Sequence, residues 1–158
     1  MTQDASTVMS HGRPPERQMT REEIVAFFER RQAATDNLDA AALAADYAPD
    51  CIVESPMGGT HHGPAAVEHV FRGWFSAFLD LKTQVEERLI DGNRVVQVTK
   101  LEGTHIGEFL GLSPTGKPFY FSGVAVYEIH GRQIVRERRI YDFTGLLLQI
   151  GVLKAKPA

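Results

Sequence analysis

The sequence is poor in features that would place it outside the cell or in a membrane. One cysteine, Cys51, occurs among 158 residues, so no internal disulfide bond can form. The N-terminus lacks the apolar segment of a secretory signal, and no stretch reaches the ~18 apolar residues that a membrane span needs. Excess charge is also lacking, since the net charge is only -3. We therefore expect a soluble, cytoplasmic protein that binds neither nucleic acid nor a membrane.

Motifs for metals, phosphates and nucleophiles are missing as well. Of six histidines only His61 and His62 are close in sequence, and neighbours in an extended segment point to opposite sides. No His-x-x-x-His motif or cysteine pair is present, and no glycine loop precedes Lys-Ser or Lys-Thr. No serine lies in a Gly-x-Ser-x-Gly elbow. We therefore expect neither a metal nor a cofactor.

What the sequence does have is the composition of an ordinary globular protein, with 43% hydrophobic and 23% charged residues. Residues 1–19 are polar and contain Gly12, Pro14 and Pro15, which predicts a disordered N-terminal arm. The remaining residues, 20–158, are enough for one domain with its own core and too few for two.

Helical patterns fill the first half of this domain. Thr20 and Glu23 form a capping-box pattern, and Asp39 is a suitable N-cap for a second, Ala-rich helix that we expect Pro49 to stop. Residues 51–54 predict a short strand. A third helix follows Pro64, because apolar residues recur there every three or four positions: Val67, Val70, Phe71, Trp74, Phe75 and Phe78.

After Asp80 the apolar period changes to two, which is typical of strands. Residues 81–90, 94–106, 119–129 and 133–143 predict four long strands, with hairpin turns at Gly92 and Gly131 and a short apolar helix or strand at 146–153. The fold class is therefore α+β, a conical barrel in which a strongly bent, mostly antiparallel sheet packs on three N-terminal helices. The residues expected to be buried include Val70, Phe71, Trp74, Phe78, Val96, Val98, Val124 and Val126.

The first candidate for catalysis is Asp142, near the end of the last strand. Alternation places Arg138 and Asp142 on one face of this strand, and Glu137, Arg139 and Tyr141 on the other. A carboxylate desolvated beside aromatic neighbours would have a raised pKa and could act as a general acid or base. Equally, Asp142 could cap the segment that follows it.

The second candidate is His105, which shares a strand face with Thr99, Leu101 and Gly103. If this face is the concave one, the imidazole could shuttle protons inside the pocket; otherwise it is a hydrogen-bonded structural group.

Further residues are candidates for binding a substrate. Glu137 and the neighbouring arginines could form an ion-pair cluster on the surface. Alternatively, Arg138 could point inward and either pair with Asp142 or bind an anionic oxygen of a substrate. We also expect Trp74, Phe121 and Tyr127 to contribute rings to the pocket wall.

Three segments carry a family resemblance. Residues 103–117, Gly-Thr-His-Ile-Gly-Glu-Phe-Leu-Gly-Leu-Ser-Pro-Thr-Gly-Lys, are similar to a motif common in SnoaL-like polyketide (ester) cyclases of the nuclear transport factor 2-like superfamily. Phe121-Ser122-Gly123, followed by residues 130–135, resembles the next hairpin of that family. Glu137 and then residues 142–151, Asp-Phe-Thr-Gly-Leu-Leu-Leu-Gln-Ile-Gly, resemble its closing signature.

The resemblance implies a conical α+β barrel, often dimeric through the outer sheet, whose cyclases close rings by aldol condensation without a cofactor. It implies that Asp142 is the general acid/base and that His105 faces the pocket. One departure stands out: Arg138 occupies the position after the glutamate where the family commonly has tryptophan.

Our leading hypothesis is accordingly a cofactor-independent cyclase or isomerase that acts on a polyketide-like or other small carbonyl substrate. An epoxide hydrolase of the same superfamily is an alternative, as is a non-catalytic protein that binds small molecules or serves as a dimeric scaffold. In each case we expect a small hydrophobic ligand in a pocket, and a homodimer.

Overall fold

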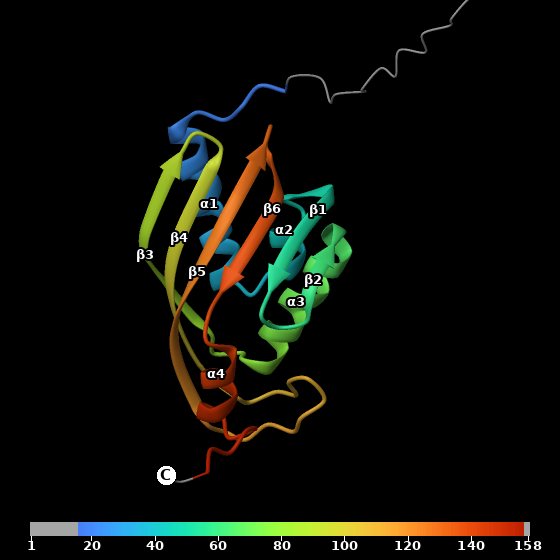
Figure 1. The fold of residues 1–158 in the computed structure, drawn as a ribbon, viewed down its shortest axis with the longest axis vertical. Helices are drawn as coiled ribbons and strands as arrows, with labels where there is room; N and C mark the ends of the chain where they lie inside the picture. Colours follow the sequence, from blue (N-terminus) through green and yellow to red (C-terminus); the bar gives the residue numbers. More distant parts are fainter. Residues whose placement is uncertain (1–15, 157–158) are drawn as a thin grey trace, which may run out of the picture.

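The computed structural model describes residues 16–156 of the chain (Figure 1). The first fifteen residues of the predicted disordered arm lie outside this range. Residues 16–19 lead directly into the first helix: Met19 is buried in the core, and Arg17 forms an ion pair of 2.6 Å with Glu23. The packed part of the chain therefore begins a few residues before Thr20.

Four helices lie within residues 16–156, and each begins where a local signal sets it. Helix α1 (Arg21–Asp36) has the predicted capping box, in which Thr20 and Glu23 exchange hydrogen bonds through side chain and backbone. Helix α2 (Ala40–Ala44) is capped by Asp39, and α3 (Gly63–Ala77) carries Pro64 in its first turn. Helix α4 (Phe143–Gln149) lies near the C-terminus. No helix in this range is long and apolar enough to cross a membrane.

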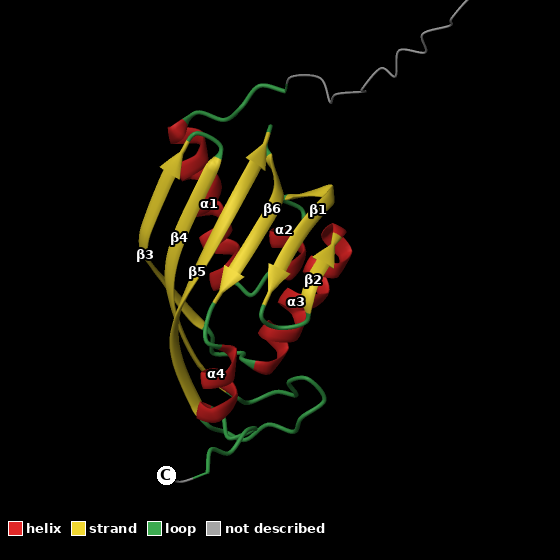
Figure 2. Ribbon diagram, in the orientation of Figure 1, coloured by secondary structure: helices red, strands yellow, loops and turns green. Residues whose placement is uncertain are grey.

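Six strands in the same range form one sheet in the order β2-β1-β6-β5-β4-β3. They are β1 (Tyr47–Ser55), β2 (Gly59–His62), β3 (Lys82–Asp91), β4 (Arg94–Thr104), β5 (Pro118–His130) and β6 (Gln133–Ile140). All neighbouring strands are antiparallel except β1 and β6, which run parallel. Helices α1, α2 and α3 cover one face of the bent sheet (Figure 2), which confirms the predicted α+β class.

Three local predictions were wrong. The second helix ends at Ala44, well before Pro49, and Pro49 lies inside β1. There the pairing of β1 with β6 shifts register between Tyr47 and Ile52, so proline occupies a stretch where the ladder is interrupted. Strand β2 was not predicted, and α4 begins at Phe143, inside the stretch assigned to the last strand, because Asp142 starts a helix there.

Gly107, in the Gly-Thr-His-Ile-Gly motif, allows the connection after β4 to touch the end of α3. Its amide donates to the Ala77 carbonyl at 2.9 Å, and a Cβ at this position would lie 1.9 Å from the Ser76 carbonyl oxygen. No side chain fits at such a distance, so glycine is required for this backbone contact.

The buried core forms two clusters. One surrounds Phe28 and Tyr47, the other surrounds Trp74 and Phe78, and Phe71 packs against both. The cavity described below draws its wall from both clusters.

The outer face of the sheet differs from what the sequence predicted. Val70, Trp74 and Phe78 are buried as expected, but Phe71, Val96, Val98, Val124 and Val126 are only half-buried. The valines at 96, 98 and 126 alternate with cavity-lining residues, so their side chains lie on the face away from the helices. With Leu89 and Ile140, which are more than half exposed, these residues form an apolar strip that we call the outer strip: Leu89, Val96, Val98, Val126 and Ile140.

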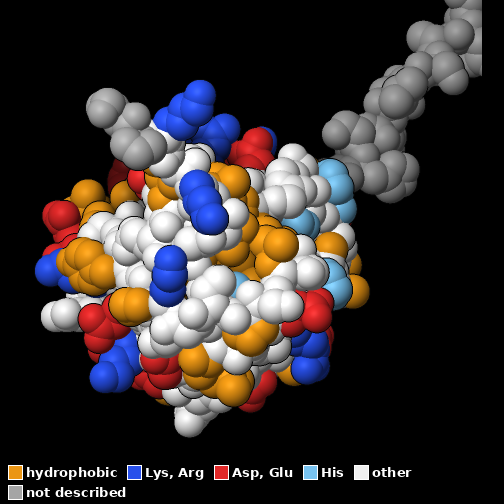
Figure 3. Space-filling model, turned by 90° about the horizontal axis from the view of Figure 1, so that it is seen from below, with side chains coloured by type: hydrophobic (Ala, Val, Ile, Leu, Met, Phe, Trp, Pro, Cys, Tyr) orange, Lys and Arg blue, Asp and Glu red, His pale blue; other side chains and the backbone are white. Residues whose placement is uncertain are grey.

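The end of the molecule that carries α4 also exposes apolar side chains. Ile106, Leu110, Leu112 and Leu148 are exposed there. Seen from below, apolar atoms at this end are interrupted by Lys and Arg side chains and by polar atoms (Figure 3). Scattered exposure of this kind is normal for a protein surface.

Candidate functional site

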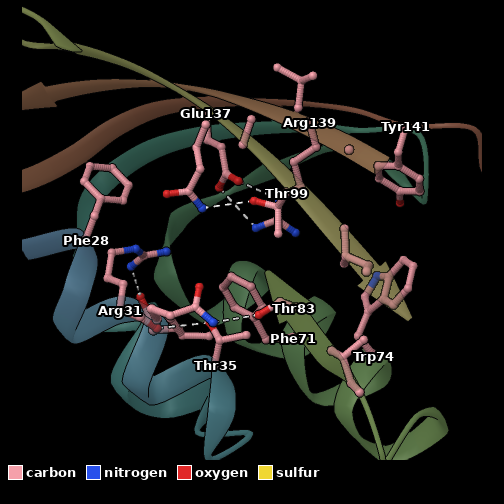
Figure 4. Close-up of a pocket in the computed structure, with 18 of the residues that line it drawn as sticks. Phe28, Arg31, Thr35, Phe71, Trp74, Thr83, Thr99, Glu137, Arg139 and Tyr141 are labelled. Atoms are coloured by element: carbon pink, nitrogen blue, oxygen red, sulfur yellow. Dashed lines mark hydrogen bonds and ion pairs between the residues drawn. The ribbon is translucent and has the colours of Figure 1, made fainter. Parts of the chain in front are cut away.

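A cavity of about 180 Å³ lies between the helices and the concave face of the sheet (Figure 4). Its walls come from α1, α2, α3 and strands β3 to β6, with Tyr141 just beyond β6. The volume is below the roughly 300–1,000 Å³ of pockets that hold drug-sized ligands. The cavity therefore suits a small molecule.

One half of the cavity is aromatic and aliphatic. Trp74, Phe71 and Phe75 of α3 form its floor, and Leu101 and Phe121 of the sheet face them. The Trp74 ring lies 6.3 Å from Phe121 and 5.9 Å from Tyr141, measured between centroids. These rings provide an apolar surface for a flat molecule.

The other half is built on a buried ion pair between two residues of β6. Arg139 donates from Nε to Glu137 Oε1 at 2.8 Å and from Nη2 to Oε2 at 3.1 Å. Both side chains point into the cavity in Figure 4, and their exposed fractions are only 3% for Glu137 and 13% for Arg139. The Arg139 guanidinium also lies 4.7 Å above the Phe71 ring. A charged pair is thus fixed over the aromatic floor.

A second ion pair supports the first. The Tyr47 hydroxyl donates to Glu137 Oε2, and its oxygen accepts from Arg31 Nη2 at 3.2 Å. Arg31 in turn pairs with Asp46 at 2.8 Å, and Arg30 reaches the same carboxylate from the exposed side at 2.7 Å. The buried charges are therefore linked by hydrogen bonds from α1 through β1 to β6.

Glu137 remains ionised in this network. Burial alone would raise the pKa of its carboxyl, but the charge and hydrogen bonds of Arg139 and the hydroxyl of Tyr47 outweigh burial and lower it. The lowered pKa stabilises the folded state. This stabilisation is fully present at pH values above the ordinary pKa of a glutamate carboxyl, and it is lost as the pH falls through the lower pKa that Glu137 has in the folded protein. Glu137 is the only carboxylate among the cavity-lining residues.

Tyr127, also on the cavity wall, yields a prediction for alkaline pH. Burial and the nearby Glu137 charge raise the pKa of its hydroxyl from 10.0 to about 12. The folded state therefore holds this proton more tightly than the unfolded state. The resulting stabilisation is complete below pH 10 and is lost between pH 10 and about 12.

We expect the Tm of the wild type to fall more steeply over this pH interval than the Tm of Tyr127→Phe, as measured by thermal unfolding. Equal slopes for the two proteins would contradict the prediction.

Asp142 does not line the cavity. Its side chain is exposed and accepts a hydrogen bond from the Gly145 amide at 2.7 Å, which makes it the N-cap of α4. Only its neighbour Tyr141 reaches the cavity wall. The prediction that Asp142 and His105 reach one enclosed cavity was therefore wrong. Whether Asp142 takes part in catalysis stays a prediction.

The capping role has a direct test. Asn caps a helix as well as Asp does, so Asp142→Asn is expected to keep the free energy of unfolding within about 0.5 kcal/mol, whereas Asp142→Ala should lower it by about 1 kcal/mol. Chemical denaturation of the three proteins measures both values. Equal stability of the Ala variant and the wild type would show that the cap contributes nothing.

His105 is buried away from the cavity. Its Nδ1 lies 3.1 Å from Thr115 Oγ1, which donates to the Ile150 carbonyl at 2.6 Å. The ring packs against Phe78 and Phe109. His105 thus joins the connection after β4 to the end of α4, and its position fits the structural alternative.

Each of the two alternatives for Glu137 and the arginines is wrong in one respect: Arg138 does not point inward, and Glu137 does not lie at the surface. Arg138 is exposed on the outer face and pairs with Glu54 at 3.1 Å, so it does not contact Asp142 or enter the cavity. Glu137 and Arg139, interpreted first as a surface cluster, are buried inside it. The signal that pointed inward was Tyr141, an aromatic residue on the same strand face.

Trp74, Phe121 and Tyr127 all line the cavity. Whether they contact a substrate stays a prediction. Among residues 16–156, no three His, Cys, Asp or Glu side chains gather as a metal ion would require.

Comparisons with known proteins identify the family and the fold. The family model described as SnoaL-like polyketide cyclase matches residues 26–150. AclR from Streptomyces galilaeus has a similar structure, with a TM-score of 0.75, 24% identity and coverage of 87% of both chains. A protein of Jannaschia sp. CCS1 named as SnoaL-like gives a TM-score of 0.70 at 19% identity, covering 90% of this chain and 98% of that one.

An NTF2-like protein of Burkholderia pseudomallei K96243 gives a TM-score of 0.69 at 19% identity, covering 80% of this chain and 96% of that one. At these identities the structural likeness shows the NTF2-like fold. No curated protein matches the chain.

Proposed function

Because the chain belongs to the SnoaL-like polyketide cyclase family, we propose that its cavity binds a small carbonyl compound with an apolar body and converts it by cofactor-free acid–base chemistry of the cyclase or isomerase type. The observation that carries this proposal is the division of the cavity into an aromatic half and a half that holds Glu137 and Arg139. A polyketide-like molecule has a matching division, because polar carbonyl oxygens project from a carbon skeleton.

Arg139 supplies the electrostatic part of this chemistry. A carbonyl oxygen bound by its guanidinium gains negative charge when the adjacent carbon passes a proton to the Glu137 carboxylate, and the fixed cation beside that oxygen stabilises the enolate. Glu137 holds the guanidinium in place through two hydrogen bonds. Because the pKa of Glu137 is lowered, it is a weak base. The chemistry therefore suits a carbon already acidified by two flanking carbonyls.

The catalytic roles of Asp142 and His105 stay predictions that the family resemblance carries. Asp142 lies one residue beyond the cavity wall, and its carboxylate is bound to the Gly145 amide. A direct role for Asp142 would require its carboxylate to leave the Gly145 amide and turn toward the cavity.

A second function, non-catalytic binding, is supported by a specific observation. Both oxygens of Glu137 already accept hydrogen bonds, from Arg139 and from Tyr47. The cavity wall therefore offers no carboxylate oxygen without a protein donor. A binding protein needs no such oxygen, whereas a proton-transfer enzyme needs a group that can accept the proton.

Deuterium exchange separates the two functions. In heavy water, the protein is expected to accelerate exchange at the carbon between the carbonyls of 1-phenyl-1,3-butanedione, measured by proton NMR, and the rate should saturate with substrate. Binding of this diketone without any acceleration over buffer would favour the non-catalytic function.

We also propose that the protein forms a homodimer through the outer strip. These apolar side chains lie on the sheet face opposite the helices, and nothing within residues 16–156 covers Leu89 or Ile140, which are 56% and 53% exposed. Ion pairs at its border, such as Arg138 with Glu54 and Lys100 with Glu86, would form a polar rim. Two copies of one face can bury each other by twofold symmetry.

Light scattering at tens of micromolar protein tests this assembly. We expect a dimer for the wild type and a monomer for Val98→Lys, because a buried unpaired ammonium would destabilise the interface. The control His69→Glu changes an exposed residue of α3 and should remain dimeric. A monomeric wild type would contradict the proposal.

A further inference from the structure

Two hydrogen-bond donors on the cavity wall are left without a protein acceptor. Nη1 of Arg139 makes no hydrogen bond within residues 16–156, since the pair with Glu137 uses Nε and Nη2. The Tyr127 hydroxyl has no hydrogen-bond partner in the same range, although its ring packs at 4.9 Å on Phe28. Fully buried side-chain atoms without a partner occur there only on His105 and His130. Neither donor is among these fully buried atoms, so each retains some accessible surface, and both residues line the cavity.

The charges around these donors favour an anion. The cavity wall includes two guanidinium groups, Arg31 and Arg139, and one carboxylate, Glu137. Behind the wall, Asp46 pairs with Arg31 and with Arg30, whose side chain is 55% exposed. The excess positive charge is therefore confined to the wall itself, where an anion beside Arg139 would balance it, and inside the protein such attraction is stronger than in water.

The donors also border the apolar half of the cavity. The Arg139 guanidinium lies over the Phe71 ring, and this ring stacks on Phe75 at 5.9 Å. Trp74 and Phe121 continue the same apolar surface. A molecule that fits this arrangement has one charged oxygen and a flat apolar body.

We propose that the cavity selects an organic anion, a carboxylate or the enolate of an acidic carbonyl compound, whose oxygen accepts hydrogen bonds from Arg139 and Tyr127 while its apolar body lies against Trp74 and Phe121. The inference rests on the proposed function in placing the substrate in this cavity. It adds the ionisation state of that substrate and assigns Arg139 and Tyr127 as the residues that recognise it.

A pair of nearly isosteric probes, trans-cinnamate and trans-cinnamamide, tests the inference on the full chain at neutral pH. Calorimetry measures both affinities. Trp74, the only tryptophan, reports cavity occupancy through its fluorescence. We expect cinnamate to bind roughly tenfold more tightly than the amide, the usual worth of a hydrogen bond to a charged group.

Tyr127→Phe is the informative variant, because it removes a hydroxyl that has no acceptor among the described residues and should not unfold the protein. The roughly tenfold preference for cinnamate over the amide should largely disappear in this variant. Arg136→Gln, an exposed position on the same strand, is the matched control and should keep the wild-type preference.

The outcomes distinguish the inference from the function on which it rests. If both probes change Trp74 fluorescence with equal affinity, the cavity binds ligands but anion selection is overturned. If the preference survives in Tyr127→Phe, the assignment of Tyr127 is overturned. If neither probe binds the wild type, the inference and the proposed cavity site fail together.

Discussion

Replacing Glu137 with alanine is expected to lower the free energy of unfolding by about 3–5 kcal/mol, the usual cost of leaving a buried charge without its partner. Arg139 would lose both of its carboxylate contacts, and the Tyr47 hydroxyl would lose its acceptor. Denaturant titration followed by circular dichroism measures the change.

A double-mutant cycle separates the interaction between Glu137 and Arg139 from the packing that each side chain contributes by itself. Arg139→Gln and Glu137→Gln should each destabilise the protein, but the double variant should be more stable than the sum of the two effects predicts, by at least about 1 kcal/mol. Glutamine at both positions leaves no buried charge unpaired and can still accept from Tyr47. Strict additivity would show that the two side chains do not act as a pair.

Glu54 provides the matched control for Glu137→Ala, because it is a glutamate whose ion pairs are exposed. It pairs with Arg138 at 3.1 Å and with Arg136 at 3.9 Å, but these arginine side chains are 61% and 55% exposed. Exposed ion pairs contribute about 0–1 kcal/mol, so Glu54→Ala should cost no more than that. If Glu137→Ala costs as little as Glu54→Ala, the buried network does not stabilise the fold.

The second large effect concerns turnover. If the protein accelerates deuterium exchange, Arg139→Gln is expected to reduce the rate about 10²–10³-fold, as when an oxyanion donor is removed from other enzymes. Arg139→Lys keeps the charge but not the two-point contact with Glu137, so it should retain an intermediate rate. Arg136→Gln should match the wild type, since Arg136 is exposed on the outer face.

Asp142→Asn in the same assay decides the role that the family resemblance implies. A fall of about 10²–10⁴-fold with unchanged stability would establish Asp142 as a general acid or base. An unchanged rate would leave Asp142 as a cap only. Because Arg139 and Asp142 lie on opposite sides of the cavity wall, the two variants report on separate groups.

The sequence by itself determined the features that depend on nearby residues. The capping box at Thr20, the cap at Asp39 and the turns at Gly92 and Gly131 are set by interactions within a few residues, so their patterns predicted them correctly. The change of apolar period from helix to strand gave the α+β class for the same reason. The motif segments gave the family, which the comparisons confirm.

Which face of β6 lies inside was decided only by the tertiary structure. Alternation separates Glu137 from Arg138, but it gives two faces without saying which one meets the helices. The choice depends on the pairing of Glu137 with Tyr127 in β5 and on partners distant in sequence, Tyr47 and Arg31. A charged pair can be buried there because those partners supply its hydrogen bonds, and a local pattern contains none of them.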